Sequence, residues 1–291
     1  MQNFKDKTCI ETHVVQHLEE DIRLQEYGCG IFKSILSKSA LKKALKKKLI
    51  TLDNKVAKTS DWVKINQVIN LYAEKKLQSK NLFRLKFDVL FEDEHLAIVH
   101  KPSGYPTSGN YFKTIENALG YNLKQSYERD QLPFPQPVHR LDNPTSGALI
   151  VAKTLSTKSL LSVLFEKKSI KKSYTAIVKG KLDKENDTID LAVDHKASRT
   201  SYKVESVFKK NNEQYSMLKL WPETGRTHQI RIHLASIGHP IVGDNLYGDK
   251  EGKPPLFLHA SSVEFIHPKT DKILTLETDI PQKFLKFINR L

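Results

Sequence analysis

Residues 139–147, with the sequence His-Arg-Leu-Asp-Asn-Pro-Thr-Ser-Gly, place one carboxylate, Asp142, in a turn-forming loop two positions after Arg140. Directly behind this loop, residues 148–152 form a short apolar run, which is typical of a buried strand. Such a strand would fix the loop to a rigid sheet, an arrangement that suits a carboxylate acting as a nucleophile. The alternative is that the Asp-Asn-Pro sequence merely starts a turn.

The length and composition limit the class of protein. With 291 residues the chain has room for two domains, and no apolar run approaches the ~18 residues of a membrane span. The N-terminus is charged and lacks the apolar core of a secretory signal. Only Cys9 and Cys29 occur, too few for a disulfide framework or a cysteine-based zinc site. We therefore expect a cytoplasmic protein without a membrane segment.

The net charge of +14 indicates a polyanionic partner, because lysines and arginines that neutralise phosphates release counterions. Residues 1–86 carry 18 Lys and Arg against nine Asp and Glu, whereas residues 87–291 carry 29 against 24. Most of the basic excess therefore lies in the first third of the chain. A basic surface that only confers solubility is the alternative.

Residues 39–49 have the pattern of a small basic helix. Apolar residues recur at a helical period on one side, and four lysines crowd the other: Leu41, Ala44, Leu45 and Leu49 against Lys42, Lys43, Lys46 and Lys47. Short strands around an Asp53-Asn54 turn are predicted to follow. A lysine-rich helix face is often only solvated, so the pattern alone leaves its role open.

This first segment resembles the RNA-binding domain of the ribosomal S-four type, over roughly residues 23–72. Members of that family commonly carry an Asn-Gly turn after the first strand and a glycine before it, where this chain has Asp53-Asn54 and Lys48. The domain organisation that we predict is an N-terminal extension (1–22), a small α/β RNA-binding domain (23–80), a linker (81–86) and a catalytic domain (87–291).

The rest of the chain alternates strand-like runs with a few helices. Helical patterns are predicted from Ser156, as N-cap, to Lys167, from Thr227 to Ile237, and after Pro281, where Phe284, Leu285 and Ile288 should face inward. Strands are predicted at residues 87–91, 96–100, 148–152, 174–179, 200–208 and 215–221. Strands without regular helix alternation favour an α+β fold with a mixed, largely antiparallel sheet.

Three further motifs join the Asp142 loop: Lys-Ser-Tyr-Thr-Ala at 172–176, Gly-Arg-Thr-His-Gln-Ile-Arg-Ile-His-Leu at 225–234, and Gly-His-Pro-Ile-Val-Gly-Asp at 238–244. Together with His-Arg-Leu-Asp-x-x-Thr-Ser-Gly they resemble the RluA-type pseudouridine synthases, over residues 87–291. The resemblance implies a catalytic domain of the pseudouridine synthase type. It also implies isomerisation of uridine to pseudouridine within RNA, without a metal or an organic cofactor.

The resemblance also assigns roles to four residues. Asp142 matches the catalytic aspartate, which attacks either the ribose anomeric carbon or the pyrimidine ring; the residues leave this choice open. Arg140 would occupy the space of the extruded base and contact phosphate or neighbouring bases. Tyr174 would stack on the flipped uracil, with a core tyrosine as the alternative. Arg231 would pair with Asp142 and keep it ionised, with a helix-surface arginine as the alternative.

The histidines are expected to make structural hydrogen bonds. A metal would need a completed ligand shell, which the spacing of His228, His233, His239 and His259 does not provide. His139 is expected to organise the backbone of its loop. Neither Ser108 nor Ser146 has the Gly-x-Ser-x-Gly context of a serine hydrolase.

Ribosomal RNA is the expected substrate, because an added RNA-binding domain suits a large folded target, and transfer RNA is the alternative. Two other functions remain open: a non-catalytic RNA-binding or ribosome-assembly protein, and a nuclease with Asp142 and Asp244 as metal ligands. We expect a monomer.

Overall fold

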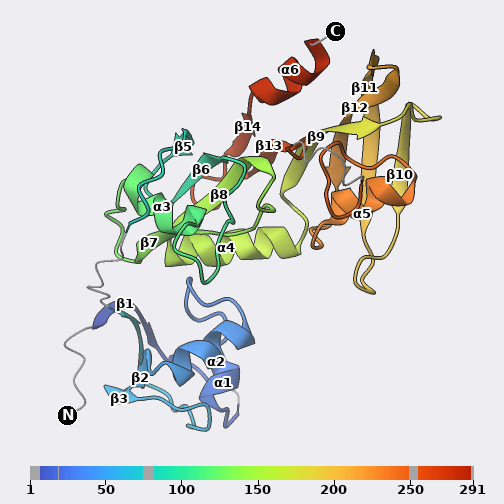
Figure 1. Cartoon of the computed structure of the whole chain (residues 1–291). Helices are drawn as coiled ribbons and strands as arrows, with labels where there is room; N and C mark the ends of the chain where they lie inside the picture. The colour runs from blue at the N-terminus through green and yellow to red at the C-terminus, as the bar shows by residue number, and fades with distance from the viewer. Residues whose placement is uncertain (1–6, 19, 75–81, 249–254, 290–291) are drawn as a thin grey trace.

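The computed structural model describes residues 7–18, 20–74, 82–248 and 255–289 of the chain. Within them the strands form two separate sheets, one of four strands and one of ten. Figure 1 shows the smaller sheet and its helices as one unit, drawn in blue, and the larger sheet as the other. None of the described helices is long and apolar enough to cross a membrane.

The N-terminal unit packs two helices against an antiparallel sheet in the order β1-β4-β2-β3. Its elements are β1 (Lys7–Val14), α1 (Leu24–Tyr27), α2 (Lys38–Lys46), β2 (Ile50–Leu52), β3 (Lys55–Val56) and β4 (Val68–Glu74). Strand β1 pairs with β4 from Lys7 to Val14. This sheet therefore begins inside the segment 1–22, which the sequence predicted to be an extension outside the small domain.

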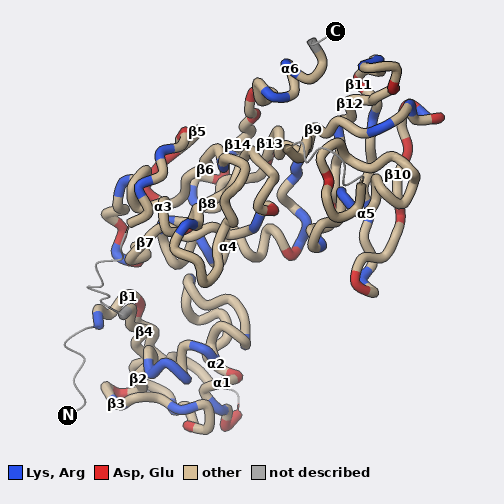
Figure 2. The backbone as a smooth tube through the Cα atoms, viewed as in Figure 1, with Lys and Arg blue, Asp and Glu red and all other residues tan. Residues whose placement is uncertain are grey.

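The basic helix forms where the sequence predicts it, with shifted ends. It starts after Ser37, whose side chain accepts a hydrogen bond from the Ala40 amide, and buries Leu41 and Leu45. It ends at Lys46 instead of Leu49, because Lys48 adopts a left-handed φ of 56°. Figure 2 shows the lysines along α2 and after it.

The Asp53-Asn54 turn joins β2 to β3 as the sequence predicts. Both residues have positive φ, 47° and 63°, which is typical of a type I′ hairpin turn. The Asp53 carboxylate accepts hydrogen bonds from the Val68 amide at 2.9 Å and from the Gln67 side chain at 2.8 Å. The turn is therefore anchored to β4 without the glycine of the common Asn-Gly sequence.

The large sheet runs in the order β10-β11-β12-β9-β13-β8-β6-β5, with β14 beside β13 and β7 beside β8. Its strands are β5 (Val89–Glu92), β6 (Leu96–Lys101), β7 (Gln131–Pro137), β8 (Ser146–Thr154), β9 (Lys171–Lys179), β10 (Asn186–Asp190), β11 (Arg199–Lys210), β12 (Glu213–Pro222), β13 (Leu258–Ile266) and β14 (Ile273–Glu277). The paired strands are antiparallel except β8 and β13. The predicted α+β class with a largely antiparallel sheet is confirmed.

In the part of the chain that the structure describes, four helices accompany this sheet: α3 (Ile115–Asn122), α4 (Leu155–Glu166), α5 (Gln229–Ser236) and α6 (Gln282–Asn289). The N-cap of α4 is Thr154, not Ser156, because the Thr154 hydroxyl accepts from the Thr157 amide while Ser156 is buried in the first turn. In α6, Phe284 is fully buried and Ile288 packs against the same core, but Leu285 is 39% exposed, so the prediction that all three face inward was wrong for Leu285.

Strand β8, which follows the Asp142 loop, is buried along its whole length. Close packing on its neighbour β13 requires a glycine at its start. Gly147 has a φ of 121°, and a Cβ at this position would lie 2.2 Å from the carbonyl oxygen of Ala260 in β13. The apolar run that the sequence predicted to be a strand is therefore a buried strand inside the sheet, between β13 and β6.

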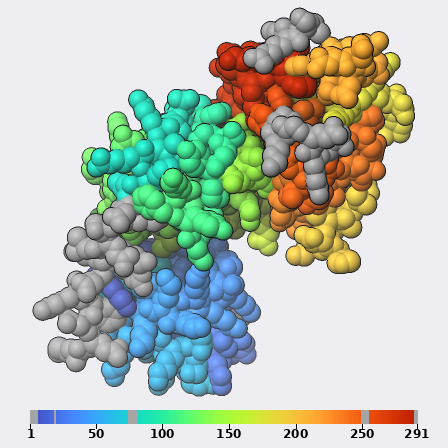
Figure 3. Space-filling model, in the orientation of Figure 1, coloured from blue at the N-terminus to red at the C-terminus, as the bar shows by residue number. Residues whose placement is uncertain are grey.

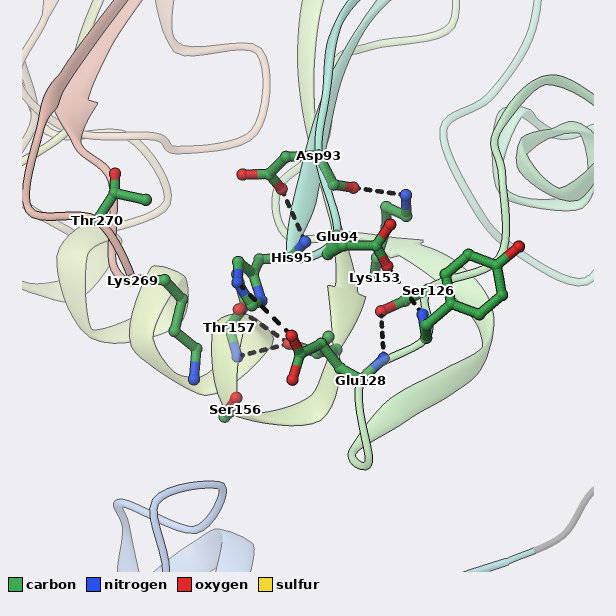
Figure 4. A network of polar contacts seen from close by, with 12 residues as sticks. Asp93, Glu94, His95, Ser126, Glu128, Lys153, Ser156, Thr157, Lys269 and Thr270 are labelled. Carbon is green, nitrogen blue, oxygen red and sulfur yellow. Dashed lines mark hydrogen bonds and ion pairs between the residues drawn. The ribbon is translucent and has the colours of Figure 1, made fainter.

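The far end of β8 is fixed by a polar network, which Figure 4 shows from close by. Lys153 donates to the Asp93 carbonyl at 2.5 Å and to the Glu92 carboxylate at 2.7 Å. The Asp93 carboxylate accepts from the His95 amide at 2.7 Å, and the Glu94 carboxylate from the Tyr127 amide at 2.8 Å. The Lys153 contacts join the β5–β6 turn to β8, and the Glu94 contact joins this turn to the segment before β7.

The two units meet at α4. The Ser159 hydroxyl on this helix donates a 2.6 Å hydrogen bond to the carbonyl of Ser34, in the loop before α2. Figure 3 shows the blue N-terminal unit in contact with the green part of the larger unit. The predicted linker, 81–86, falls partly outside the described residues; of the rest, Phe83 and Leu85 pack against the core that contains α3.

Candidate active site

The fully buried Lys101, the last residue of β6, is hydrogen-bonded to the backbone of the Asp142 loop. Its ammonium donates to the carbonyl oxygens of Asn143 at 3.1 Å and Thr145 at 2.7 Å, the residues on either side of the turn. Burial lowers the pKa of Lys101 to about 7, although the nearby charge of Asp142 acts in the opposite direction. Lys101 therefore connects the loop to the sheet.

A second connection comes from the segment after Lys101. The Thr107 hydroxyl donates to the Leu141 carbonyl at 2.8 Å and accepts from the Leu141 amide at 3.1 Å. The Gly104 amide donates to the Asn143 carbonyl at 2.9 Å. The two residues that flank Asp142, Leu141 and Asn143, are therefore each hydrogen-bonded to the segment 104–107.

Arg231 on α5 lies beside Asp142 and binds a second carboxylate more tightly. Its Nη1 is 3.5 Å from Oδ2 of Asp142, whereas Nε and Nη2 each lie 2.7 Å from an oxygen of Asp244. Burial opposes the charge on Arg231, but the hydrogen bonds and charge of Asp244 outweigh it and raise the pKa of the guanidinium. The predicted proximity of Arg231 to Asp142 is present in the structure, and Asp244, which orients Arg231, is an additional partner that the motifs did not indicate.

Asp244 is fully buried and has its own set of donors. Its Oδ1 accepts from the backbone amides of Leu246 at 3.0 Å and Tyr247 at 3.1 Å. Burial alone would raise the pKa of Asp244, but the hydrogen bonds from Arg231 and these amides outweigh it and lower the pKa. Because both of its oxygens are used by Arg231, Asp244 is unsuited to hold a metal with Asp142, which argues against the nuclease alternative.

His228 is a second side chain whose nitrogen lies within 4 Å of the Asp142 carboxylate. It precedes α5 in a left-handed conformation (φ 56°), which is why the helix begins at Gln229 and not at Thr227. Its Nε2 lies 3.8 Å from Oδ1 of Asp142, and its Nδ1 lies 3.0 Å from the Tyr247 hydroxyl. Its spacing to Arg231, three residues along a helix start, is the sequence signal that could have identified it.

Tyr174 belongs to β9 and lines the same pocket as Asp142. Burial, and then the negative charge of Asp142, raise the pKa of its hydroxyl, so the phenol stays protonated at neutral pH. A protonated phenol can donate a hydrogen bond to a substrate and offers a flat ring for stacking.

The pocket has a volume of about 300 Å³ and opens beside the Asp142 loop. Among the described residues, its lining includes one acidic residue, Asp142, and four Lys or Arg residues: Arg140, Lys172, Arg226 and Arg231. Arg140 is exposed, while Arg231 is buried. The structure therefore brings together all four residues that the sequence singled out, in a cavity that attracts anions.

The other histidines named in the sequence analysis, His139, His233, His239 and His259, make structural hydrogen bonds, as the sequence predicts. His139 accepts from the Ile150 amide of β8 at 3.0 Å, and burial lowers the pKa of its imidazole to about 3. His233 contacts Ser198, His239 contacts the Lys179 carbonyl, and His259 contacts Ser146 and Thr278.

Comparisons with known proteins identify the family. A family model described as RNA pseudouridylate synthase matches residues 95–236. The ribosomal large subunit pseudouridine synthase D of Nitrosomonas europaea is 34% identical over 270 residues, which cover 84% of this chain and 77% of the relative. The chain belongs to the RluA-type RNA pseudouridine synthases. The synthase is also 37% identical to the RNA pseudouridine synthase YhcT of Bacillus subtilis over 217 residues, 67% of this chain and 69% of that one.

The fold of the synthase agrees with this assignment. The solved structure of human RNA pseudouridylate synthase domain containing 1 matches it with a TM-score of 0.58 and 25% identity, over 70% of this chain and 86% of the human one. The synthase is an isomerase that acts on RNA.

The distances of 3.5 and 3.8 Å from Asp142 to Arg231 and His228 exceed those of short charge-assisted hydrogen bonds, about 2.7–2.9 Å. The Asp142 carboxylate is thus oriented by these two neighbours while its lone pairs stay accessible.

Proposed function

We propose that this synthase modifies uridine in ribosomal RNA and that Asp142 is its nucleophile. In the isomerisation, the bond between C1′ and N1 breaks and a bond between C1′ and C5 forms. The proton on C5 leaves, and N1 takes up a proton. The observation that carries this proposal is the place of Asp142 in the pocket, 3.5 Å from the Arg231 guanidinium.

The ribosomal target rests on two supports. Several relatives are named ribosomal large subunit pseudouridine synthases, including those of Nitrosomonas europaea and Pseudomonas aeruginosa. The net charge of +14 suits a large polyanion. A transfer RNA target is the second candidate, which the mapping experiment below distinguishes.

The other site residues act on the extruded nucleotide. Arg140, exposed at the pocket, fills the space that the base leaves in the RNA. Tyr174 stacks on the uracil, and its protonated hydroxyl lies near the atoms that exchange protons. Arg231 keeps Asp142 ionised and oriented once substrate has displaced water from the pocket.

The N-terminal unit serves as an RNA-binding domain of the S-four type. Support comes from its separate sheet, from the lysines on the exposed face of α2, and from its contact with α4, which contributes Phe165 to the pocket. RNA held by this unit would extend towards Asp142. We further propose that the synthase is a cytoplasmic monomer that needs no metal or organic cofactor.

Mapping of pseudouridines in total RNA tests the target. Cells that lack this chain are compared with cells that carry the wild-type or the Asp142→Asn chain. We expect one or a few ribosomal pseudouridines to disappear with the deletion and to return only with the wild type. Loss of sites in transfer RNA would refute the ribosomal assignment, and identical maps in the three strains would refute the function.

A further inference from the structure

Lys172 is a cation in the pocket that the reaction described above does not use. It lies on β9 two residues before Tyr174, so both side chains are on the same face of the strand, about 7 Å apart along it. Both line the pocket. The intervening Ser173 faces the other way and contacts Ser262.

Lys172 is half-buried, and among the described residues no carboxylate forms an ion pair with it. Its described neighbour is the Phe165 ring, whose centroid is 5.9 Å from Nζ. Burial lowers the pKa of Lys172. An unpaired, partly desolvated cation destabilises a fold, so its presence in a pocket indicates a role in binding an anion.

The space next to this ammonium is kept open by Gly225, in the loop between β12 and α5. A Cβ at this position would lie 3.9 Å from Nζ of Lys172, in van der Waals contact with it. A larger side chain would cover the ammonium from this side. Arg226, the next residue, also lines the pocket.

The chemistry of the substrate identifies the anion. A uracil base and its ribose are neutral at pH 7, so the anionic groups of RNA are its phosphodiesters. A base stacked on Tyr174 and a phosphate at Lys172 would be separated by the two-residue repeat of the strand, about 7 Å. This is comparable with the distance from a base to its own backbone phosphate. An extruded nucleotide brings this phosphate with it into the pocket, where it loses water.

We propose that Lys172 binds the backbone phosphate of the target nucleotide and so holds the extruded uridine in the pocket. This inference rests on the proposed function of the Asp142 site. Lys172 then acts on substrate binding and not on the bond changes at the base. Its removal should weaken RNA binding while leaving turnover of bound RNA nearly intact.

The first test compares Lys172→Met with Lys171→Met on a hairpin RNA that carries the mapped uridine. Lys171 is the matched control: it is the preceding residue of β9, is exposed, and pairs with Glu264 outside the pocket. For Lys172→Met we expect about a tenfold higher KM, a kcat within about twofold, and a slope of log K against log[salt] smaller by about 0.7. For Lys171→Met we expect no change in kcat and KM.

A structural role for Lys172 would give a different result. Because methionine removes a half-buried charge and keeps the length of the side chain, the proposal predicts an unchanged or higher melting temperature for Lys172→Met. Lys172→Arg should recover most of the affinity. A large fall in melting temperature, or a loss of kcat with an unchanged KM, would overturn the proposal.

The decisive test replaces the phosphate. A methylphosphonate, which is neutral, is placed at the target nucleotide on its 5′ or its 3′ side, and binding is measured with the wild type and Lys172→Met. At one of the two positions, the neutral linkage should weaken wild-type binding about tenfold and leave Lys172→Met unaffected. Equal losses in both proteins at both positions would overturn the proposal. Failure of the wild type to form pseudouridine in any RNA would refute the function itself.

Discussion

Arg231 holds two carboxylates at once, Asp244 through two 2.7 Å hydrogen bonds and Asp142 at 3.5 Å. The tight pair fixes the direction of the guanidinium, and the loose pair orients the proposed nucleophile without capturing it. If Asp244 were absent, Arg231 would be free to close on Asp142 and occupy its lone pairs. Asp244 is therefore a positioning residue of the site.

Asp244→Asn should remove this orientation. Because one partner of a buried ion pair is lost, we expect the free energy of unfolding at pH 7 to fall by about 3 kcal/mol. We also expect kcat to fall at least tenfold, since Arg231 then competes for Asp142. Urea unfolding and single-turnover kinetics measure the two effects; wild-type kcat in this variant would contradict the positioning role.

The stability contributed by the ion pair between Arg231 and Asp244 depends on pH. The folded pKa of Asp244 lies below its unfolded value of about 3.8, so its contribution to stability is present above pH 3.8 and is lost as the pH falls through the folded pKa. The difference in stability between the wild type and Asp244→Asn should therefore shrink below about pH 4. A difference that stays constant on acidification would show that the Asp244 charge does not stabilise the fold.

Lys101 predicts a second rise in stability with pH, at neutral to alkaline pH. Its folded pKa is about 7 and its ordinary value is 10.5, so between these values the unfolded chain binds a proton that the folded chain lacks. Stability should rise with pH in this window by at most about 1.4 kcal/mol per pH unit, and this rise should be missing in Lys101→Met. Chemical denaturation of both proteins from pH 6 to 10 tests this; parallel curves would contradict it.

Gly147 should tolerate no side chain. Gly147→Ala places a Cβ 2.2 Å from the Ala260 carbonyl oxygen at a φ of 121°, so strain and overlap together should cost about 3 kcal/mol or more. Gly104→Ala is the matched control, because its φ is 90° but no atom lies within 4 Å of the new Cβ. There we expect about 1–2 kcal/mol. Equal losses would show that packing against β13 is not the cause.

The exposed lysines of α2 should contribute to RNA binding through their charge alone. Glutamine at Lys42, Lys43, Lys46 and Lys47 should weaken RNA binding and flatten its dependence on salt, by about 0.7 in the log–log slope for each lost phosphate contact. The control replaces four exposed lysines of the larger unit: Lys181, Lys196, Lys209 and Lys269. An unchanged slope in the α2 variant would mean that this face is only solvated.

The sequence predicted those parts of the fold that depend on local pattern. The run at 148–152 became the central part of β8, and the apolar period of residues 39–49 became the packed side of α2. It failed where adjacent residues compete for one role. Thr154 and Ser156 are both good caps, and only the backbone conformation at Thr154 decides between them.

The candidate site was predictable to the extent that its residues lie within motifs. Asp142 stood out as a carboxylate in a turn before a strand. The ion pair between Arg231 and Asp244 could not be predicted in this way, because the two residues are 13 positions apart and belong to a helix and a following turn. Lys101 was equally hidden, since a lysine that ends a strand is usually exposed, and only the fold shows that it lies beneath the Asp142 loop.

The central claim is that Asp142 forms a transient bond to the substrate. Release of tritium from C5 of labelled uridine in RNA measures the isomerisation directly. The account predicts that Asp142→Asn abolishes this release while RNA binding stays nearly intact, and that Asp183→Asn, an exposed carboxylate of the same unit, releases tritium like the wild type. Full release of tritium by Asp142→Asn would contradict the account.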